Sequence, residues 1–268
     1  MSALATPLLR RPGATLARAN PVAKLGVATI IALALLPTVD VITPALVLAV
    51  ELACLPLTGL DLGHVLRRTW PLLFAAVGIG FSNALFSADK AGALLVDWWV
   101  VEITMASATD GLSLAIRVVA IALPGVLALA TTDPTDLADA LVQQLHLPWR
   151  FAIGALAAMR LLPLMAAEWR VLGLARRARG LEAGRSPVSK ARVFWSQAFA
   201  LLVGAIRRGV RMSIAMEARG FGARSGRTFA RQQRMLRPDW WLLVATVLVV
   251  LAATATSVTL GAWHLVLT

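Results

Sequence analysis

Runs of apolar residues, each about as long as a lipid bilayer is thick, recur along this chain. Five runs cover residues 22–37, 44–60, 70–87, 112–130 and 240–262, and a further one lies near 149–166. A helix rises about 1.5 Å per residue, so ~17 residues extend roughly 25 Å, and the shorter runs cross a membrane only when polar side chains reach out at their ends. The pattern predicts an all-α integral membrane protein with about five to six transmembrane helices.

The pattern changes character after residue 149. Segment 149–179 starts apolar, passes Pro163 and becomes rich in arginine, and segment 192–219 places arginines on one helical face and aliphatic residues on another. Such amphipathic helices lie at a membrane surface rather than across it. We therefore predict two long amphipathic cytoplasmic helices, with a kink or break at Pro163 and a linker at 181–190.

These features divide the chain into three predicted parts. Transmembrane helices occupy 1–148, the amphipathic cytoplasmic helices occupy 149–238, and a last transmembrane helix occupies 239–268. Within the first part, the connection 88–111 is too long for a tight turn and contains tryptophans flanked by acids. Because tryptophan favours the membrane interface, this connection predicts a short hairpin or re-entrant segment on the outer side.

Composition and charge agree with this topology. Of all residues, 59% are hydrophobic and 15% are charged, which fits a bilayer better than a soluble domain. Residues 160–237 hold 17 of the 26 Lys and Arg residues and three acids, a net charge of +14. Since cytoplasmic loops of membrane proteins carry the excess of Lys and Arg, we predict a multi-pass protein of the cell membrane whose N-terminus and 131–238 region are cytoplasmic. Because membrane topology accounts for the excess of positive charge, no nucleic-acid partner is predicted. A nucleic-acid-binding membrane anchor stays open as an alternative.

The residue types that usually carry catalysis are scattered. No stretch matches the phosphate-binding loop G-x-x-x-x-G-K-[ST], and none of the three lysines follows a glycine. Cys54 is the single cysteine, and His64, His146 and His264 occur singly and far apart. We predict a protein that is not an enzyme, with no catalytic site, no metal site and no cofactor.

Two short motifs predict helix starts. In Asn20-Pro21 and Asp133-Pro134, the polar side chain caps free amide groups and proline occupies the first helical position. Asp136 suits the positive end of the second helix. Lys24 is expected at the level of the lipid phosphates, so capping and topology account for both motifs.

One tripeptide occurs twice in the basic stretch. Ala178-Arg179-Gly180 and Ala218-Arg219-Gly220 lie 40 residues apart, each at the predicted end of an amphipathic helix. Glycine adopts the left-handed conformation that ends a helix, and arginine opposes the negative end of the helix dipole. One copy would be an ordinary helix end, but two copies present two guanidinium forks, which bind carboxylates in a bidentate way. A partner with two acidic grooves, such as a dimer of related subunits, would match this pair.

Both tripeptides belong to a longer set of motifs. The set comprises Asn20–Leu25, Thr131–Leu137 through Leu147-Pro148, Arg160–Pro163, Glu168–Arg170, Arg177–Gly180 and Ala215–Phe221. With these motifs the chain resembles, over nearly its whole length, the transmembrane T component (EcfT type) of energy-coupling factor transporters. These are the vitamin and metal-ion importers of the ABC class.

The resemblance implies a role for each motif residue. Arg179 and Arg219 would end two long crossed coupling helices and insert into grooves on two ATPase subunits, separate or fused, while Arg177, Arg211 and Glu217 would support these helices. It also implies a substrate-capturing S component as a partner within the lipid bilayer. The expected function is therefore that of a non-catalytic coupling subunit, which passes ATP-driven motion to the S component for vitamin or micronutrient uptake.

Two other interpretations stay open. A dedicated biotin or cobalt/nickel importer would use the same fold. A protein of a different class, a membrane enzyme that recognises phosphate through Arg179 and Arg219, would need paired catalytic acids nearby, and Glu182 with Glu217 make a poor pair.

Overall fold

The protein, described by a computed structural model, divides into two compact units. The membrane bundle comprises residues 1–140 and 233–268, and the helix-pair unit comprises residues 141–232. The structure describes residues 16, 18–38, 40–60, 62–87, 94–98, 101–181, 184, 186–221, 229 and 231–261.

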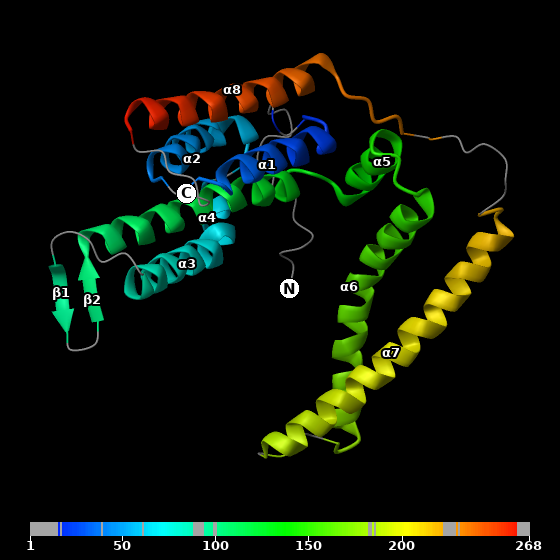
Figure 1. The fold of residues 1–268 in the computed structure, drawn as a ribbon. Helices are drawn as coiled ribbons and strands as arrows, with labels where there is room; N and C mark the ends of the chain where they lie inside the picture. The colour runs from blue at the N-terminus through cyan, green and yellow to red at the C-terminus, as the bar shows by residue number, and fades with distance from the viewer. Residues whose placement is uncertain are drawn as a thin grey trace. The chain divides into compact units, whose positions relative to one another are not determined.

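Apolar helices build the membrane bundle, and they occur where the apolar runs predict them (Figure 1). They are α1 (Pro21–Leu35), α2 (Ile42–Cys54), α3 (Leu62–Phe86), α4 (Met105–Ala130) and α8 (Arg237–Thr259), and a short 3-10 turn, Leu55–Thr58, follows α2. By length and composition, α3, α4 and α8 are able to cross a membrane, as is helix α6 (Trp149–Ala178) of the other unit, whereas α1 and α2 are shorter. The predicted all-α, multi-pass membrane protein is confirmed.

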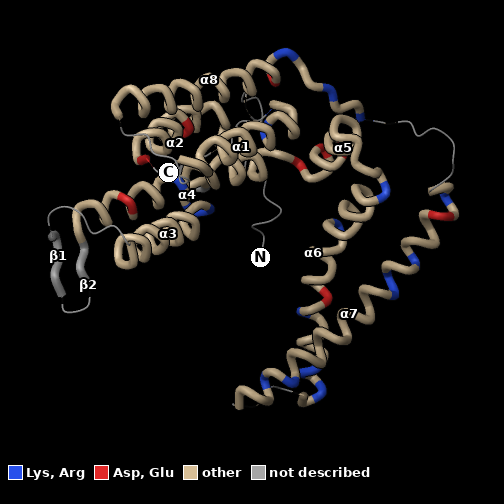
Figure 2. The backbone as a smooth tube through the Cα atoms, in the orientation of Figure 1, with Lys and Arg blue, Asp and Glu red and all other residues tan. Residues whose placement is uncertain are grey.

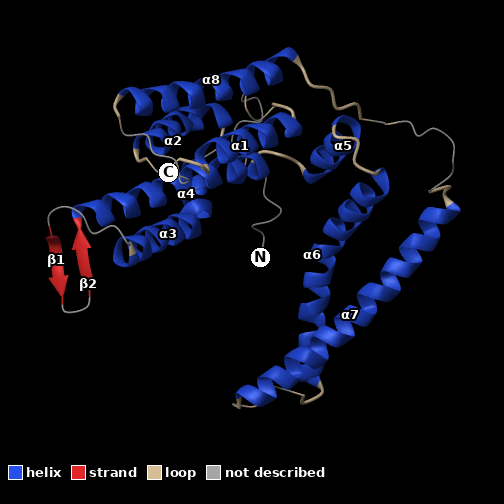
Figure 3. Cartoon of the chain, viewed as in Figure 1, coloured by secondary structure: helices blue, strands red, loops and turns tan. Residues whose placement is uncertain are grey.

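The connection between α3 and α4 contains a small antiparallel hairpin, drawn in red in Figure 3. Its strands are β1 (Leu94–Trp98) and β2 (Val101–Thr104). A hairpin is one of the two forms predicted for 88–111, although residues 88–93, 99 and 100 lie outside the described part. Thr104 then starts α4 through a capping box with Ser107, in which each side chain bonds the other residue's amide.

The helices of the bundle pack in layers. Helices α1 and α2 lie between α4 and α8, and α3 packs on α4 (Figure 1). A buried apolar cluster joins α1, α2, α4 and α8 through Ile31, Leu35, Val47, Ala120, Val250 and Ala253. Between α3 and α4 the backbones approach so closely that a Cβ atom added to Gly80 would lie 2.6 Å from the carbonyl oxygen of Gly111. Small residues allow such contacts between membrane helices.

A buried carboxylate organises one end of the bundle. Asp40, between α1 and α2, accepts hydrogen bonds from the amide of Thr43 (2.7 Å), from Thr43 Oγ1 (2.5 Å) and from Ser257 Oγ of α8 (2.6 Å). Ser113 Oγ of α4 donates to the backbone oxygen of Asp40 at 2.8 Å. Burial by itself would raise the pKa of Asp40, but the hydrogen bonds from Ser257 and Thr43 outweigh it and lower the pKa below its ordinary value. Asp40 therefore ties the α1–α2 connection to both α4 and α8.

Both predicted helix starts are confirmed. The Asn20 side chain accepts a hydrogen bond from the amide of Val22 at 2.9 Å at the start of α1. The Asp133 side chain accepts one from the amide of Thr135 at 2.7 Å at the start of α5 (Pro134–Gln144). The sequence thus predicts these local structures correctly because each depends on neighbouring residues alone.

Lys24 faces the interior of the bundle, while its expected depth at the level of the lipid phosphates stays a prediction. Its side chain is buried, with 8% of the residue exposed, and Nζ donates a hydrogen bond to the carbonyl oxygen of Thr131 at 3.1 Å. A buried ammonium group needs acceptors, and the end of α4 supplies one. Only the packing of α1 against α4 brings these two residues together.

The helix-pair unit contains two long helices, α6 (Trp149–Ala178) and α7 (Pro187–Ala218). Helix α6 continues through Pro163, so of the predicted kink or break the break does not occur, and the kink stays a prediction. A proline removes one backbone hydrogen bond, and the turns on both sides hold the helix together. The linker is also shorter than the predicted 181–190, since α7 begins at Pro187, where proline suits the first helical turn.

Replacing Asp40 by Asn should destabilise the bundle. The substitution removes the charge that strengthens the hydrogen bonds from Thr43 and Ser257, so we expect a loss of about 1 to 3 kcal/mol, measured as a lower thermal unfolding midpoint in detergent. Asp133→Asn is the matched control, because Asn caps a helix about as well as Asp. Equal midpoints for the two variants would contradict the role given to Asp40.

Candidate functional site

Lys and Arg residues recur along α6 and α7, where they are blue in Figure 2. The acids within the two helices are Glu168 in α6 and Glu217 in α7. The two Ala-Arg-Gly motifs stand at the ends of these helices, where the sequence places them. The site is therefore built from helix ends on a basic pair of helices.

The first motif forms a complete helix ending. Helix α6 ends at Ala178, Arg179 is its C-cap, and Gly180 has φ of 73°. The amide of Gly180 donates to the carbonyl oxygen of Arg177 at 2.9 Å, and the amide of Leu181 donates to that of Arg176 at 3.0 Å. This pair of bonds is the Schellman motif, which requires a left-handed residue and so favours glycine.

The second motif repeats the same geometry. Helix α7 ends at Ala218, Arg219 is its C-cap, and Gly220 has φ of 79°. The amide of Gly220 donates to the carbonyl oxygen of Glu217 at 2.9 Å, and the amide of Phe221 donates to that of Met216 at 3.0 Å. The two arginines therefore occupy equivalent backbone positions, one residue before a left-handed glycine.

The helices α6 and α7 run antiparallel and cross (Figure 1), so the two motifs lie at opposite ends of the pair. Trp149, at the start of α6, packs edge-on against Phe221, with ring centroids 4.7 Å apart. At the other end, Arg176 donates to the carbonyl oxygen of Val193 (3.3 Å) and to Ser196 Oγ (3.0 Å) near the start of α7. At about 1.5 Å per residue, α6 separates the two motifs by roughly 45 Å.

Polar contacts join α6 and α7 between these ends. Arg208 forms an ion pair with Glu168, at 3.2 Å between Nη2 and Oε2. Gln197 is buried and donates from Nε2 to the carbonyl oxygen of Trp169 at 2.5 Å. The sequence does not predict these pairs, because their members lie 28 or 40 residues apart. The available signal is a polar residue inside an apolar segment, which Gln197 provides.

The motif arginines remain available for a partner. Arg179 and Arg219 are exposed, and within the described residues neither side chain forms a hydrogen bond or ion pair. The same is true of Arg177, Arg211 and Glu217, so their role in supporting the helices stays a prediction. The helix ending thus fixes the backbone of Arg179 and of Arg219, while each guanidinium group has no hydrogen-bond partner among the described residues.

Large apolar side chains are also exposed along both helices. More than half of the residue surface is accessible at Phe151, Val171, Trp195, Phe199, Ile206 and Ile214. Within the described part of α6 and α7, Gln197 is the buried residue. Exposed apolar surface on this scale indicates contact with lipid or with another protein.

The described residues contain no group of three or more side chains suited to hold a metal ion. Of the acids considered as a catalytic pair, Glu217 is exposed, and Glu182 lies outside the described residues.

Comparison with known proteins shows the family of this chain. Residues 13–229 match the CbiQ family, whose description is cobalt transport protein. The energy-coupling factor transporter transmembrane protein EcfT of Limosilactobacillus fermentum is 30% identical over 188 residues, which cover 67% of this chain and 69% of that protein. The protein of the same name from Staphylococcus aureus is 25% identical over 194 residues, covering 69% and 72%. EcfT 1 of Listeria monocytogenes is 26% identical over 220 residues, covering 79% and 81%.

The apolar bundle and the matched family define a multi-pass membrane component of a transport system. The chain belongs to the CbiQ family. It is a transmembrane component of the energy-coupling factor transporter type, and this type is non-catalytic. The alternative of a phosphate-recognising membrane enzyme is therefore overturned.

Proposed function

We propose that this protein couples two cytoplasmic ATPase subunits to a substrate-binding S component in an importer for a vitamin or another micronutrient. The observation that carries the proposal is the pair of exposed Arg-Gly helix ends at opposite ends of α6 and α7. One ATPase subunit binds at each end, through Arg179 and Arg219. Movement of the subunits then changes the crossing of the two helices.

The chemistry of docking follows from the arginine side chain. A guanidinium group forms two parallel hydrogen bonds to a carboxylate, and these are strongest where water is excluded. Each motif arginine extends from a rigid helix end, so it offers such a fork with little loss of backbone freedom. Acidic grooves on the ATPase subunits fit this geometry.

The exposed apolar faces of α6 and α7 supply a second interface. Residues such as Trp195, Phe199 and Ile206 are more than half exposed and need a cover of lipid or protein. We assign this cover to the S component and the surrounding bilayer. The same helices then contact the ATPases at their ends and the S component along their sides.

A dedicated cobalt or nickel importer, or a biotin importer, is the second candidate. The matched family is described by cobalt transport, which favours a metal ion as cargo. The relatives are named as energy-coupling factor transmembrane proteins, which favours the broader function.

Removal of the motif arginines should release the ATPase subunits. For Arg179→Ala or Arg219→Ala we expect a loss of about 2 to 5 kcal/mol at the affected contact, because a carboxylate of the partner is left buried and unpaired. The ATPases should co-purify at reduced stoichiometry with either variant and least with the double variant, and substrate uptake should fall in parallel. Arg→Lys should restore part of the binding, since Lys cannot form the planar fork.

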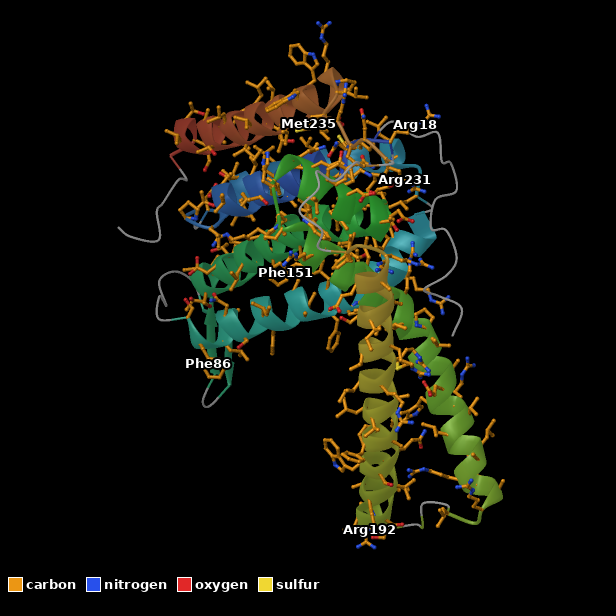
Figure 4. All side chains as sticks on the ribbon, turned by 90° about the vertical axis from the view of Figure 1, so that its right-hand side faces the viewer. Arg18, Phe86, Phe151, Arg192, Arg231 and Met235 are labelled. Atoms are coloured by element: carbon orange, nitrogen blue, oxygen red, sulfur yellow. The ribbon has the colours of Figure 1, made fainter. Side chains whose placement is uncertain are left out.

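The matched control is Arg192→Ala. Arg192 is an exposed arginine near the start of α7, and its side chain points out from the helix (Figure 4). Loss of one such surface charge should change binding little. Wild-type ATPase stoichiometry and uptake in the double Arg→Ala variant would overturn the docking proposal and leave the motifs as ordinary helix ends.

The charge pattern also leads us to propose an orientation, with the N-terminus and residues 131–238 in the cytoplasm and the connection 88–111 outside. Single cysteines at Ser87 and Ser186, in a Cys54→Ser background, test it. A membrane-impermeant thiol reagent applied to intact cells should label the cysteine at Ser87 and spare the one at Ser186. Labelling of Ser186→Cys alone would invert the proposed orientation.

A further inference from the structure

Two sequence motifs take no part in docking, and the structure brings them together. Asn20–Leu25 starts α1, and Thr131–Leu137 follows α4 and starts α5. They meet where Lys24 Nζ donates to the carbonyl oxygen of Thr131 at 3.1 Å. Thr131 is the C-cap of α4, so the buried ammonium group faces the negative end of that helix dipole.

A buried carboxylate of α8 joins the same cluster. Asp239 accepts a hydrogen bond from the amide of Asn20 (2.9 Å) at Oδ1 and from the amide of Leu236 (2.8 Å) at Oδ2. Asp239 and Asn20 are almost fully buried, at 5% and 6% exposure. The charge of Asp239 also acts on Lys24. This carboxylate therefore fixes the start of α8 to the start of α1.

The third member lies at the start of α5. Asp136 also acts electrostatically on Lys24, and its Oδ1 accepts a hydrogen bond from Gln233 Nε2 at 3.4 Å. We call Asn20, Lys24, Thr131, Asp136, Gln233 and Asp239 the Lys24 cluster. All of its members belong to the membrane bundle.

The position of the Lys24 cluster along the chain matters most. The chain leaves the membrane bundle after Ala140 and returns to it at Gln233. Thr131 and Asp136 precede the exit, and Gln233 and Asp239 follow the return. The exit side is thus bonded to α1 through Lys24 and Thr131, the return side is bonded to α1 through Asn20 and Asp239, and the bond from Gln233 to Asp136 joins the two sides directly.

We propose that the Lys24 cluster clamps these two connections, so that a movement of α6 and α7 is passed to α1, α4 and α8 together. This inference rests on the coupling function proposed above and makes Lys24 a positioning residue for it. Without the clamp, the two connections move independently of each other when α6 and α7 move, and ATP hydrolysis no longer drives substrate movement. A cluster that merely stabilised the bundle would affect assembly without changing the uptake obtained per ATP.

Another buried ionisable residue in the bundle provides a comparison. Glu51 of α2 lines a cavity of ≈ 200 Å³ together with Lys24, and its carboxylate oxygens have no hydrogen-bond partner in the described part of the chain. Glu51 touches neither connection through a hydrogen bond. It is therefore a buried ionisable residue of the same bundle outside the clamp.

The test uses the complex purified from its host through a tag on this chain and reconstituted in liposomes. ATP hydrolysis and uptake of radiolabelled biotin, cobalt and nickel are measured on the same preparation. Lys24→Met should keep the ATPase subunits and their hydrolysis but lower uptake per ATP at least about fivefold, the scale of an ordinary coupling energy. Lys24→Arg, which keeps the cation, should recover part of the ratio.

Two variants serve as controls. Arg18→Met removes an exposed cation two residues before Asn20, and the side chain of Arg18 points outward in Figure 4. Glu51→Gln replaces the buried carboxyl group outside the clamp by an amide of similar shape. Both should keep the wild-type ratio. An unchanged uptake per ATP in Lys24→Met overturns the clamp and leaves the coupling function standing, whereas a wild-type complex without ATPase subunits overturns the coupling function itself.

A folding defect in Lys24→Met does not end the test. Gln233→Ala removes one partly buried hydrogen bond of the cluster and leaves the buried residues in place. It should lower uptake per ATP by about twofold to fivefold, the scale of a single net hydrogen bond. An unchanged ratio in this variant would count against the clamp.

Discussion

The helix pair has almost no interior of its own, and the rest of the protein depends on this constraint. In the described part of α6 and α7, Gln197 is the buried residue, although the two helices have 30 and 32 residues. The hydrophobic effect within the unit therefore contributes little to its stability. The exposed apolar side chains need lipid or another protein as a cover, and such a surface suits a component that stands between other proteins.

Specific polar contacts fix the positions of the helices, as a hydrophobic core does in a soluble protein. In the helix pair, the Glu168–Arg208 ion pair and the bond from Gln197 set the crossing of α6 and α7. In the membrane bundle, Asp40 organises the end of α1 and the Lys24 cluster organises its beginning. Between membrane helices, packing and hydrogen bonds replace the hydrophobic drive. The bundle is consequently joined by polar contacts at both ends and by apolar packing in the middle.

The docking arginines and the Lys24 cluster need opposite surroundings. A docking arginine needs a rigid backbone and a free tip, and the Schellman endings at Gly180 and Gly220 supply both. A clamp at the chain connections needs buried, fully bonded groups, because an unpaired charge there would destabilise the bundle. Arg179 and Arg219 are exposed while Lys24 is buried, which matches the separate tasks proposed for them.

The sequence by itself determined the helical membrane class, the five apolar helices of the bundle and both Arg-Gly helix endings. Each depends on local periodicity or on a few adjacent residues, as with Gly180, whose left-handed conformation ends α6. The tertiary structure alone decided that α6 continues through Pro163, that Lys24 is buried, and that its ammonium group meets Thr131. These outcomes follow from packing between segments more than 100 residues apart, or from the many backbone hydrogen bonds around a single proline, and neither is written in the local pattern.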